Sequence, residues 1–110
     1  MKFDRWDIWL ARVAYEDQPD VYKERPVVVY SETEFFVLSL KVSSQNPHTY
    51  RDDYELRMWK EAGLHKPSFV SLRLVKIKLD DMLYKIGKLK GVDVRSIREM
   101  LENLETTKIR

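Results

Sequence analysis

Three consecutive valines, Val27 to Val29, constrain the fold more than any other stretch of this chain. β-Branched residues favour strands, and a run without polar alternation is typical of a strand that is buried on both faces. Pro26 stands at the start of the run, where its missing N–H costs little. Arg25 precedes the proline, so the pattern predicts a central strand that begins at a cationic side chain.

Alternating apolar residues predict further strands along the chain. They span residues 6–14, 34–42, 54–58 and 68–79, and residues 84–89 form a short edge strand or a turn. In the 34–42 strand, Ser39, Lys41 and Ser43 lie opposite the main apolar face. The alternation changes phase near Leu74, which indicates a bulge or a sharp bend. The polar segments 15–24, 31–33, 45–53 and 61–67 are predicted connections.

The C-terminal segment changes from period two to the helical period. Apolar residues recur at positions 94, 97, 100, 101 and 104. This spacing predicts a helix over residues 94–105, with Asp93 as its N-cap. The residues after the helix are predicted to form a frayed tail. Five or six strands and one terminal helix predict a mainly β fold. We expect a small SH3-like barrel that forms a single domain over residues 1–110.

Composition narrows the classes of function. The net charge is only +2, so binding to nucleic acid would need a local basic patch. The chain has no cysteine, which excludes disulfides and thiolate metal sites. His48 and His65 stand without a carboxylate cluster, so we predict no metal site. No window holds 18 apolar residues and no apolar signal region opens the chain, so we expect neither a membrane span nor a signal peptide.

Polar residues stand at the ends of two successive strands. Arg25 begins the valine strand, and Ser43 follows the 34–42 strand. Pairing of these strands would bring both residues to one edge of the barrel. A guanidinium directs two donors at phosphate oxygens and stays charged, and a hydroxyl can donate a further hydrogen bond. The pair therefore predicts a site for a phosphodiester.

The order of these signals resembles the MazF/PemK type of toxin from bacterial toxin–antitoxin modules. The matching segments are Asp7-Ile8-Trp9-Leu10, Arg25-Pro26-Val27-Val28-Val29, Val42-Ser43-Ser44-Gln45, residues 62–68, residues 85–89 and Asp93. The resemblance implies an SH3-like barrel and a cytoplasmic homodimer. It implies a metal-independent endoribonuclease without a cofactor, which cuts single-stranded mRNA at short sequences and leaves a 2′,3′-cyclic phosphate. It also implies a cognate antitoxin, whose acidic, disordered tail occupies the RNA groove.

On this resemblance, Arg25 matches the family's catalytic arginine and Ser43 matches its catalytic threonine. Lys23, Ser44, Gln45 and Arg73 are the candidates for substrate binding. The chain departs from the family pattern by the serine, by a glycine-free loop before Arg25, and by the lack of a carboxylate at positions 72–75. One alternative is a weakened family member that binds RNA, or a protein target such as a topoisomerase, without cleavage.

Trp9 and Trp59 fall opposite the main apolar faces of their strands. They are candidates for stacking on unpaired bases or for packing at a dimer interface, and the sequence does not separate the two roles. Lysines are also frequent from Lys76 to Lys90. We interpret them as a solvated edge that discourages strand pairing rather than as an RNA path.

Overall fold

Six antiparallel strands form one sheet, and a single long helix ends the chain. The computed structural model describes residues 2–15, 17–44 and 53–109, with side chains up to residue 104. The strands are β1 (Asp7–Ala14), β2 (Tyr22–Glu32), β3 (Phe36–Ser43), β4 (Asp53–Glu55), β5 (Phe69–Lys78) and β6 (Met82–Lys88), and the helix is α1 (Gly91–Ile109). The sheet order is β4-β5-β3-β2-β1-β6. The mainly β fold with a C-terminal helix is confirmed.

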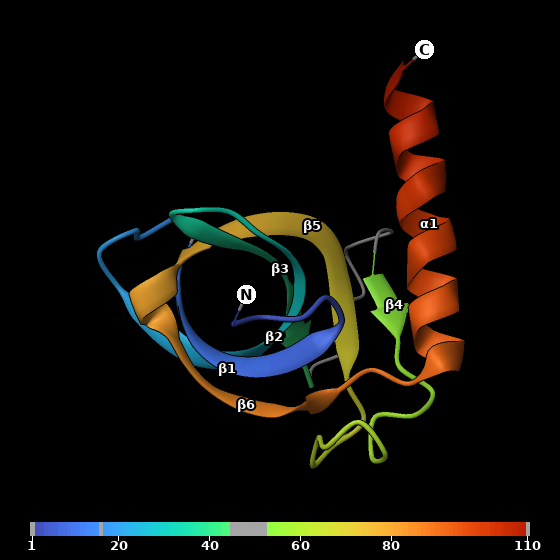
Figure 1. The fold of residues 1–110 in the computed structure, drawn as a ribbon, viewed down its shortest axis with the longest axis horizontal. Helices are drawn as coiled ribbons and strands as arrows, with labels where there is room; N and C mark the ends of the chain where they lie inside the picture. Colours follow the sequence, from blue (N-terminus) through green and yellow to red (C-terminus); the bar gives the residue numbers. More distant parts are fainter. Residues whose placement is uncertain (1, 16, 45–52, 110) are drawn as a thin grey trace.

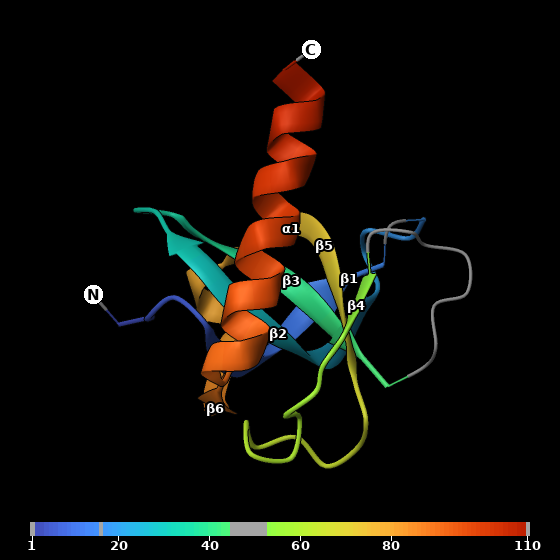
Figure 2. The same ribbon diagram turned by 90° about the vertical axis from the view of Figure 1, so that its right-hand side faces the viewer.

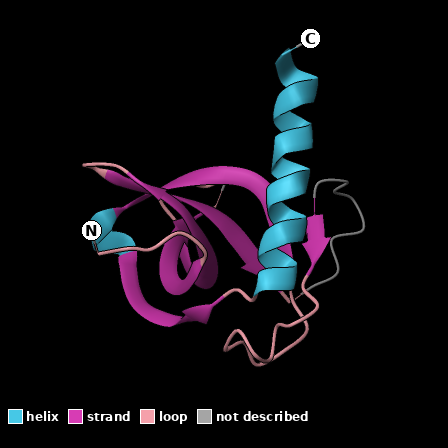
Figure 3. Cartoon of the chain, turned by 45° about the vertical axis from the view of Figure 1, so that its right-hand side comes forward, coloured by secondary structure: helices cyan, strands magenta, loops and turns pink. Residues whose placement is uncertain are grey.

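The sheet curls strongly but stays open. Strands β5, β3, β2, β1 and β6 follow one another around a barrel-like ring, and β4 lies between β5 and α1 (Figure 1). The helix stands against the outside of the ring, and its C-terminal half extends beyond the strands (Figure 2). A 3-10 turn, η1 (Leu79–Asp81), joins β5 to β6 on the side away from α1 (Figure 3).

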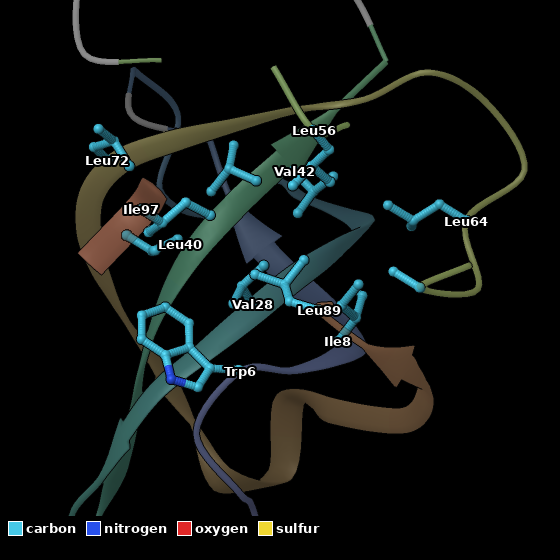
Figure 4. Close-up of a cluster of buried hydrophobic side chains, with 12 residues drawn as sticks. Trp6, Ile8, Val28, Leu40, Val42, Leu56, Leu64, Leu72, Leu89 and Ile97 are labelled. Atoms are coloured by element: carbon cyan, nitrogen blue, oxygen red, sulfur yellow. The ribbon is translucent and has the colours of Figure 1, made fainter. Parts of the chain in front are cut away.

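Apolar side chains pack on both faces of the sheet. An inner core fills the curl and includes Val27 and Val29, whereas Val28 belongs to an outer core between the sheet and α1. All three valines are completely buried, as the run predicted. Ile97 of α1 points into the outer core with Leu40 of β3 (Figure 4). The predicted helical stripe, Val94, Ile97, Met100, Leu101 and Leu104, packs there.

Strand β2 is longer than the sequence pattern indicates. Residues 22–24 were expected in a loop but continue β2, because β1 pairs with them as far as Ala14 and Tyr22. Ser31 and Glu32 also belong to β2, so the turn to β3 begins only at Thr33. The prediction of loops at both ends was therefore wrong by a few residues, since pairing with a neighbour extends strands through polar sequence.

Strand β4 is shorter than expected, and Asp93 explains why. The strand stops at Glu55, although the alternation predicted it as far as residue 58. The backbone N–H groups of Arg57 and Met58 donate to the carboxylate of Asp93, at 3.0 Å each, instead of to another strand. Asp93 lies inside the first turn of α1, so its prediction as the N-cap was wrong. The helix also continues to Ile109, past the predicted end at residue 105.

Candidate functional site

Arg25 lies on the inner face of the sheet, at the edge of the inner core. It pairs with Ala11 of β1, which is fully buried in that core. Side chains of a strand alternate between faces, so Arg25 shares its face with Val27. Arg25 itself is half-buried. The guanidinium therefore belongs to a side chain that rises from an apolar floor.

Ser43 lies on the same face, on the neighbouring strand. The β2–β3 register pairs Val27 with Lys41, and both Arg25 and Ser43 lie two residues beyond that pair. Extending the register places Arg25 directly opposite Ser43. Neighbouring strands lie about 4.8 Å apart, and opposed residues on one face reach each other. The fold thus puts both sequence-predicted residues on the inner face, each two residues beyond the last pair of β2 with β3.

Lys41 is a third polar residue of this face, and the sequence analysis gave it no role. It is half-buried and stands opposite Val27, which is completely buried. The aliphatic stem of a lysine can cover an apolar surface while the ammonium reaches water. The alternation in the sequence already put Lys41 and Ser43 on one face. Only the pairing with Val27 shows that this face is the inner one.

Arg73 comes to the same face through a bulge in β5. The β3–β5 register pairs Leu40 with Leu74 and then Val42 with Val70, so Lys41 alone faces residues 71–73. This irregularity lies where the sequence predicted one. Val70 and Leu72 point into the outer core. Alternation therefore turns Arg73, which is exposed, toward the inner face.

We call the four positive side chains of this face the cationic rim: Lys23, Arg25, Lys41 and Arg73. Lys23 is exposed and pairs with Val13, two residues before Arg25 along β2. The rim spans the adjacent strands β2, β3 and β5. Four like charges on one face attract anions. Asp53 of β4 pairs with Ser71 and adds a carboxylate beside the rim, which the sequence analysis also missed.

Two further residues, Ser44 and Gln45, were predicted to bind the substrate. Ser44 is exposed and directly follows β3. Gln45 lies outside the residues that the structure describes. The described part of the site is therefore built by strand residues together with the first residue after β3.

The two tryptophans of the sequence analysis differ in burial. Trp9 is only 8% exposed and belongs to the inner core, where its ring meets Phe3 edge-on at 4.7 Å between centroids. Trp59 is half-buried against the outer core. The prediction for Trp9 was wrong because the face of β1 that carries Trp9 packs in the inner core.

The described part of the chain offers neither a cluster of metal-binding side chains nor a membrane-spanning helix. Within residues 2–15, 17–44 and 53–109, no three acidic or histidine side chains are placed to share a metal ion. No helix in that part of the chain has the length and apolar character to cross a bilayer. His65 is exposed, and His48 lies outside the described residues.

Comparison with known proteins gives one family. The model of the PemK-like, MazF-like toxins of type II toxin–antitoxin systems matches residues 4–104. The matched range includes all six strands, the cationic rim and most of α1. No curated protein matches the chain.

Proposed function

The chain belongs to the family of PemK-like, MazF-like toxins of type II toxin–antitoxin systems, and from this premise we propose that it is an endoribonuclease that cleaves single-stranded mRNA. A toxin of such a system has a cognate antitoxin as its partner. The proposed reaction needs no metal ion and no cofactor. It takes place in the cytoplasm, where the proposed substrate is translated.

One observation supports this proposal: Arg25 and Ser43 share the inner face, each two residues beyond the Val27–Lys41 pair that ends the pairing of β2 with β3. RNA supplies its own nucleophile. The 2′-hydroxyl gives up its proton as its oxygen attacks the neighbouring phosphorus. The bond from phosphorus to the 5′-oxygen of the next nucleotide breaks, and that oxygen takes up a proton. The products are a 2′,3′-cyclic phosphate and a 5′-hydroxyl. The protein must then hold the phosphate and stabilise the charge that develops on its oxygens.

Arg25 suits the stabilisation of this charge. Its guanidinium stays protonated and can direct two parallel donors at two phosphate oxygens. Its apolar floor, formed by Ala11 and Val27, keeps water from one side of the interaction. Preorganised donors in such surroundings are worth about 10²- to 10³-fold in rate each. Ser43 supplies a hydroxyl that can donate to the same phosphate.

The experiment uses purified protein, a long unstructured RNA and a metal chelator. We expect discrete fragments that end in a 2′,3′-cyclic phosphate, and we expect Arg25→Ala to yield none at the same protein concentration. Cleavage that Arg25→Ala leaves intact would assign the reaction to another site or to a contaminant. The absence of cleavage over varied sequences would reject the proposal.

A second candidate is a family member that binds RNA or a protein target without cutting RNA. The serine at position 43, where the family has a threonine, favours it. Tight RNA binding without any fragments in the same experiment would support this candidate over the first.

We also propose two protein partners. The acidic, disordered tail of the cognate antitoxin would occupy the cationic rim, because its charge is complementary. An acidic peptide should therefore compete with RNA for the wild type. A second copy of the chain would complete a homodimer. Light scattering at micromolar concentration should give twice the chain mass, and a monomeric mass would reject the dimer.

A further inference from the structure

We propose that Tyr15 is a substrate-binding residue, whose ring stacks on an unpaired base of single-stranded RNA. The inference rests on the proposed function, because it assumes that RNA lies on the cationic rim. It adds a contact with a base to the phosphate contacts that the rim offers. Because a paired base is not available for such stacking, the contact would favour single strands over duplexes.

The first argument is the place of Tyr15 on the sheet. The β1–β2 register pairs Val13 with Lys23 of the rim. The backbone N–H of Tyr15 donates to the carbonyl oxygen of Val21 at 2.9 Å, so the ladder continues beyond the last strand residues. Side chains on one face of a strand recur at every second position. Tyr15 and Val21 therefore form the next pair on the face of the rim, directly beyond Lys23.

The second argument is the exposure of this pair. Val13 is 8% exposed and belongs to the inner core, whereas Tyr15 and Val21 are 40% and 44% exposed. Neither of them is among the described residues that pack into the two cores. The inner core thus ends at Val13, and the pair beyond it presents an aromatic ring and an aliphatic side chain to solvent. Bases of any kind stack on such a ring, because every base has a π face.

The third argument is the order of charges along β2. The face of the rim carries Arg25, then Lys23, then Val21, which lies roughly 13 Å from Arg25 at about 3.3 Å per residue. Asp20 follows directly and is exposed. A phosphate or an acidic peptide beside Val21 would be repelled by this carboxylate, whereas a base carries no charge. The order therefore favours phosphates at Arg25 and Lys23 and a base at Tyr15.

The fourth argument is the way in which the backbone holds Tyr15. Besides accepting the bond from Tyr15, Val21 donates its own N–H to the carbonyl oxygen of Gln18 at 2.9 Å. A tight turn thus closes directly next to the pair. A tyrosine side chain has only two rotatable angles, so fixing its ring on a ligand costs little conformational entropy. The ring is therefore well suited to bind a base.

Tyr22 offers a matched control. It is 50% exposed and pairs with Ala14, between the pairs of Lys23 and Val21. Alternation turns its side chain to the opposite face from Lys23 and Tyr15. Tyr22 thus has the same ring, a similar exposure and a place in the same hairpin, but it faces away from the rim.

The test compares two ligands: a short single-stranded 2′-O-methyl oligonucleotide of mixed sequence, and its abasic counterpart of the same length and charge. Both lack the attacking hydroxyl, and the ratio of their affinities measures what the bases contribute to binding. Stacking of a base on an aromatic side chain is worth about 5- to 150-fold in affinity. We expect Tyr15→Leu to lower the ratio by at least about fivefold, Tyr15→Phe to keep it, and Tyr22→Leu to leave it unchanged. Tyr15→Ile serves as a second variant without a ring, and thermal unfolding checks that each variant is folded.

The outcomes separate this inference from the proposed function. A ratio for Tyr15→Leu equal to that of the wild type would overturn the inference, even if natural RNA is cleaved. If the same variant then binds an acidic peptide more weakly, the ring would belong to the antitoxin site instead. A ratio that depends on Tyr15, without any cleavage of natural RNA, would support the inference and reject the endoribonuclease.

Two further results would overturn the inference. The first is an equal loss of affinity for both ligands in Tyr15→Leu, because the abasic ligand has nothing to stack and such a loss would mean a damaged hairpin. The second is a wild type that does not bind the oligonucleotide.

Discussion

The hydroxyl of Tyr54 donates a hydrogen bond of 2.7 Å to Oδ1 of Asp93 and so ties β4 to the first turn of α1. Asp93 also accepts the two backbone N–H groups of residues 57 and 58 and is completely buried. Bonds to a carboxylate are stronger than neutral ones. This clamp therefore holds the segment after β4 against the helix, next to the strand that carries Asp53.

Asp93→Asn should destabilise the fold without touching the rim. An amide replaces one carboxylate oxygen by an NH2 group, which cannot accept from a backbone N–H. Hydrogen bonds to charged groups are worth about 1.5–3 kcal/mol, so we expect a loss of about 2 kcal/mol in urea unfolding. The control is Asp80→Asn, since Asp80 is exposed. Equal stabilities of the two variants would contradict the role of the clamp.

Tyr54→Phe should alter the dependence of stability on alkaline pH. Burial raises the pKa of Tyr54 above its ordinary value of 10.0, and the neighbouring Asp93 raises it further, while a hydrogen bond to Ser96 opposes the shift. The unfolded chain therefore loses this proton at lower pH than the folded chain. Protonated Tyr54 therefore makes its full contribution to the free energy of unfolding below pH 10. This contribution is lost as the pH rises through the pKa of Tyr54 in the folded chain.

The measurement compares urea unfolding of wild type and Tyr54→Phe at pH values on both sides of about 10. Near neutral pH the variant should be less stable by about 1.5 kcal/mol, because one bond to Asp93 is missing. Its stability should then fall less steeply than that of the wild type in alkali. The other tyrosines are common to both proteins, so parallel curves would exclude the assigned shift.

Arg25→Ala should lower RNA cleavage by at least about 10²-fold. Arg25→Lys should recover little of the rate, because an ammonium cannot direct two parallel donors at a phosphate. The fold should persist, with a change in unfolding free energy below about 1 kcal/mol for this half-buried strand residue. Single-turnover cleavage measures the rate, and Arg98→Ala, on the exposed side of α1, is the control. Full activity of Arg25→Lys would mean that a positive charge is enough for cleavage, without the two parallel donors of the guanidinium.

Ser43→Thr should increase the cleavage rate. The extra methyl group restricts rotation about χ1, so the hydroxyl spends more time in one orientation. Three staggered rotamers reduced to one give a gain of at most about threefold. Ser43→Ala, which removes the donor, should instead lose activity. A threonine variant that is no faster than the wild type would mean that the serine hydroxyl is already held in place.

Gly87→Ala should destabilise the protein through a backbone clash. A Cβ at Gly87 would lie 2.0 Å from the carbonyl oxygen of Ala62, which belongs to the turn packed against β6. Overpacking typically costs about 1–3 kcal/mol, and a clash with rigid backbone belongs at the upper end. Gly91→Ala is the control, because nothing lies within 4 Å of its added Cβ. Thermal unfolding should separate the two variants clearly.

Local pattern was enough for most of the strands, because burial on this sheet follows alternation. Val27 to Val29 and the helical stripe behave as their spacing indicates. The failures come from distant partners. Asp93 ends β4 from 35 residues away along the chain, and no local signal around Met58 shows that its N–H is taken. Pairing with β1 likewise makes a strand of residues 22–24.

The candidate site was predictable in part for the same reason. Arg25 and Ser43 stand at strand ends, where polar residues after apolar runs draw attention. Lys41 lies inside a strand, and the alternation of that strand fits a solvent-exposed face as well as it fits a binding face. Its position becomes clear only when Val27 is known to be its partner. The prediction for Trp9 was wrong in the opposite way, because it expected an accessible ring that the structure buries. The alternation around Trp9 does not show that Phe3 packs onto its ring.

The bulge opposite Lys41 has a consequence for how this family can change in length. Three residues of β5 face one of β3, so the bulge holds two extra residues, and Arg73 keeps its face. A single inserted or deleted residue between Arg25 and the valines would instead turn the guanidinium to the outer side. Along β2, β3 and β5, evolution should therefore accept substitutions and even-numbered insertions or deletions. Odd-numbered insertions or deletions should accumulate in the connections between strands, where the number of residues does not decide on which face of the sheet a side chain lies.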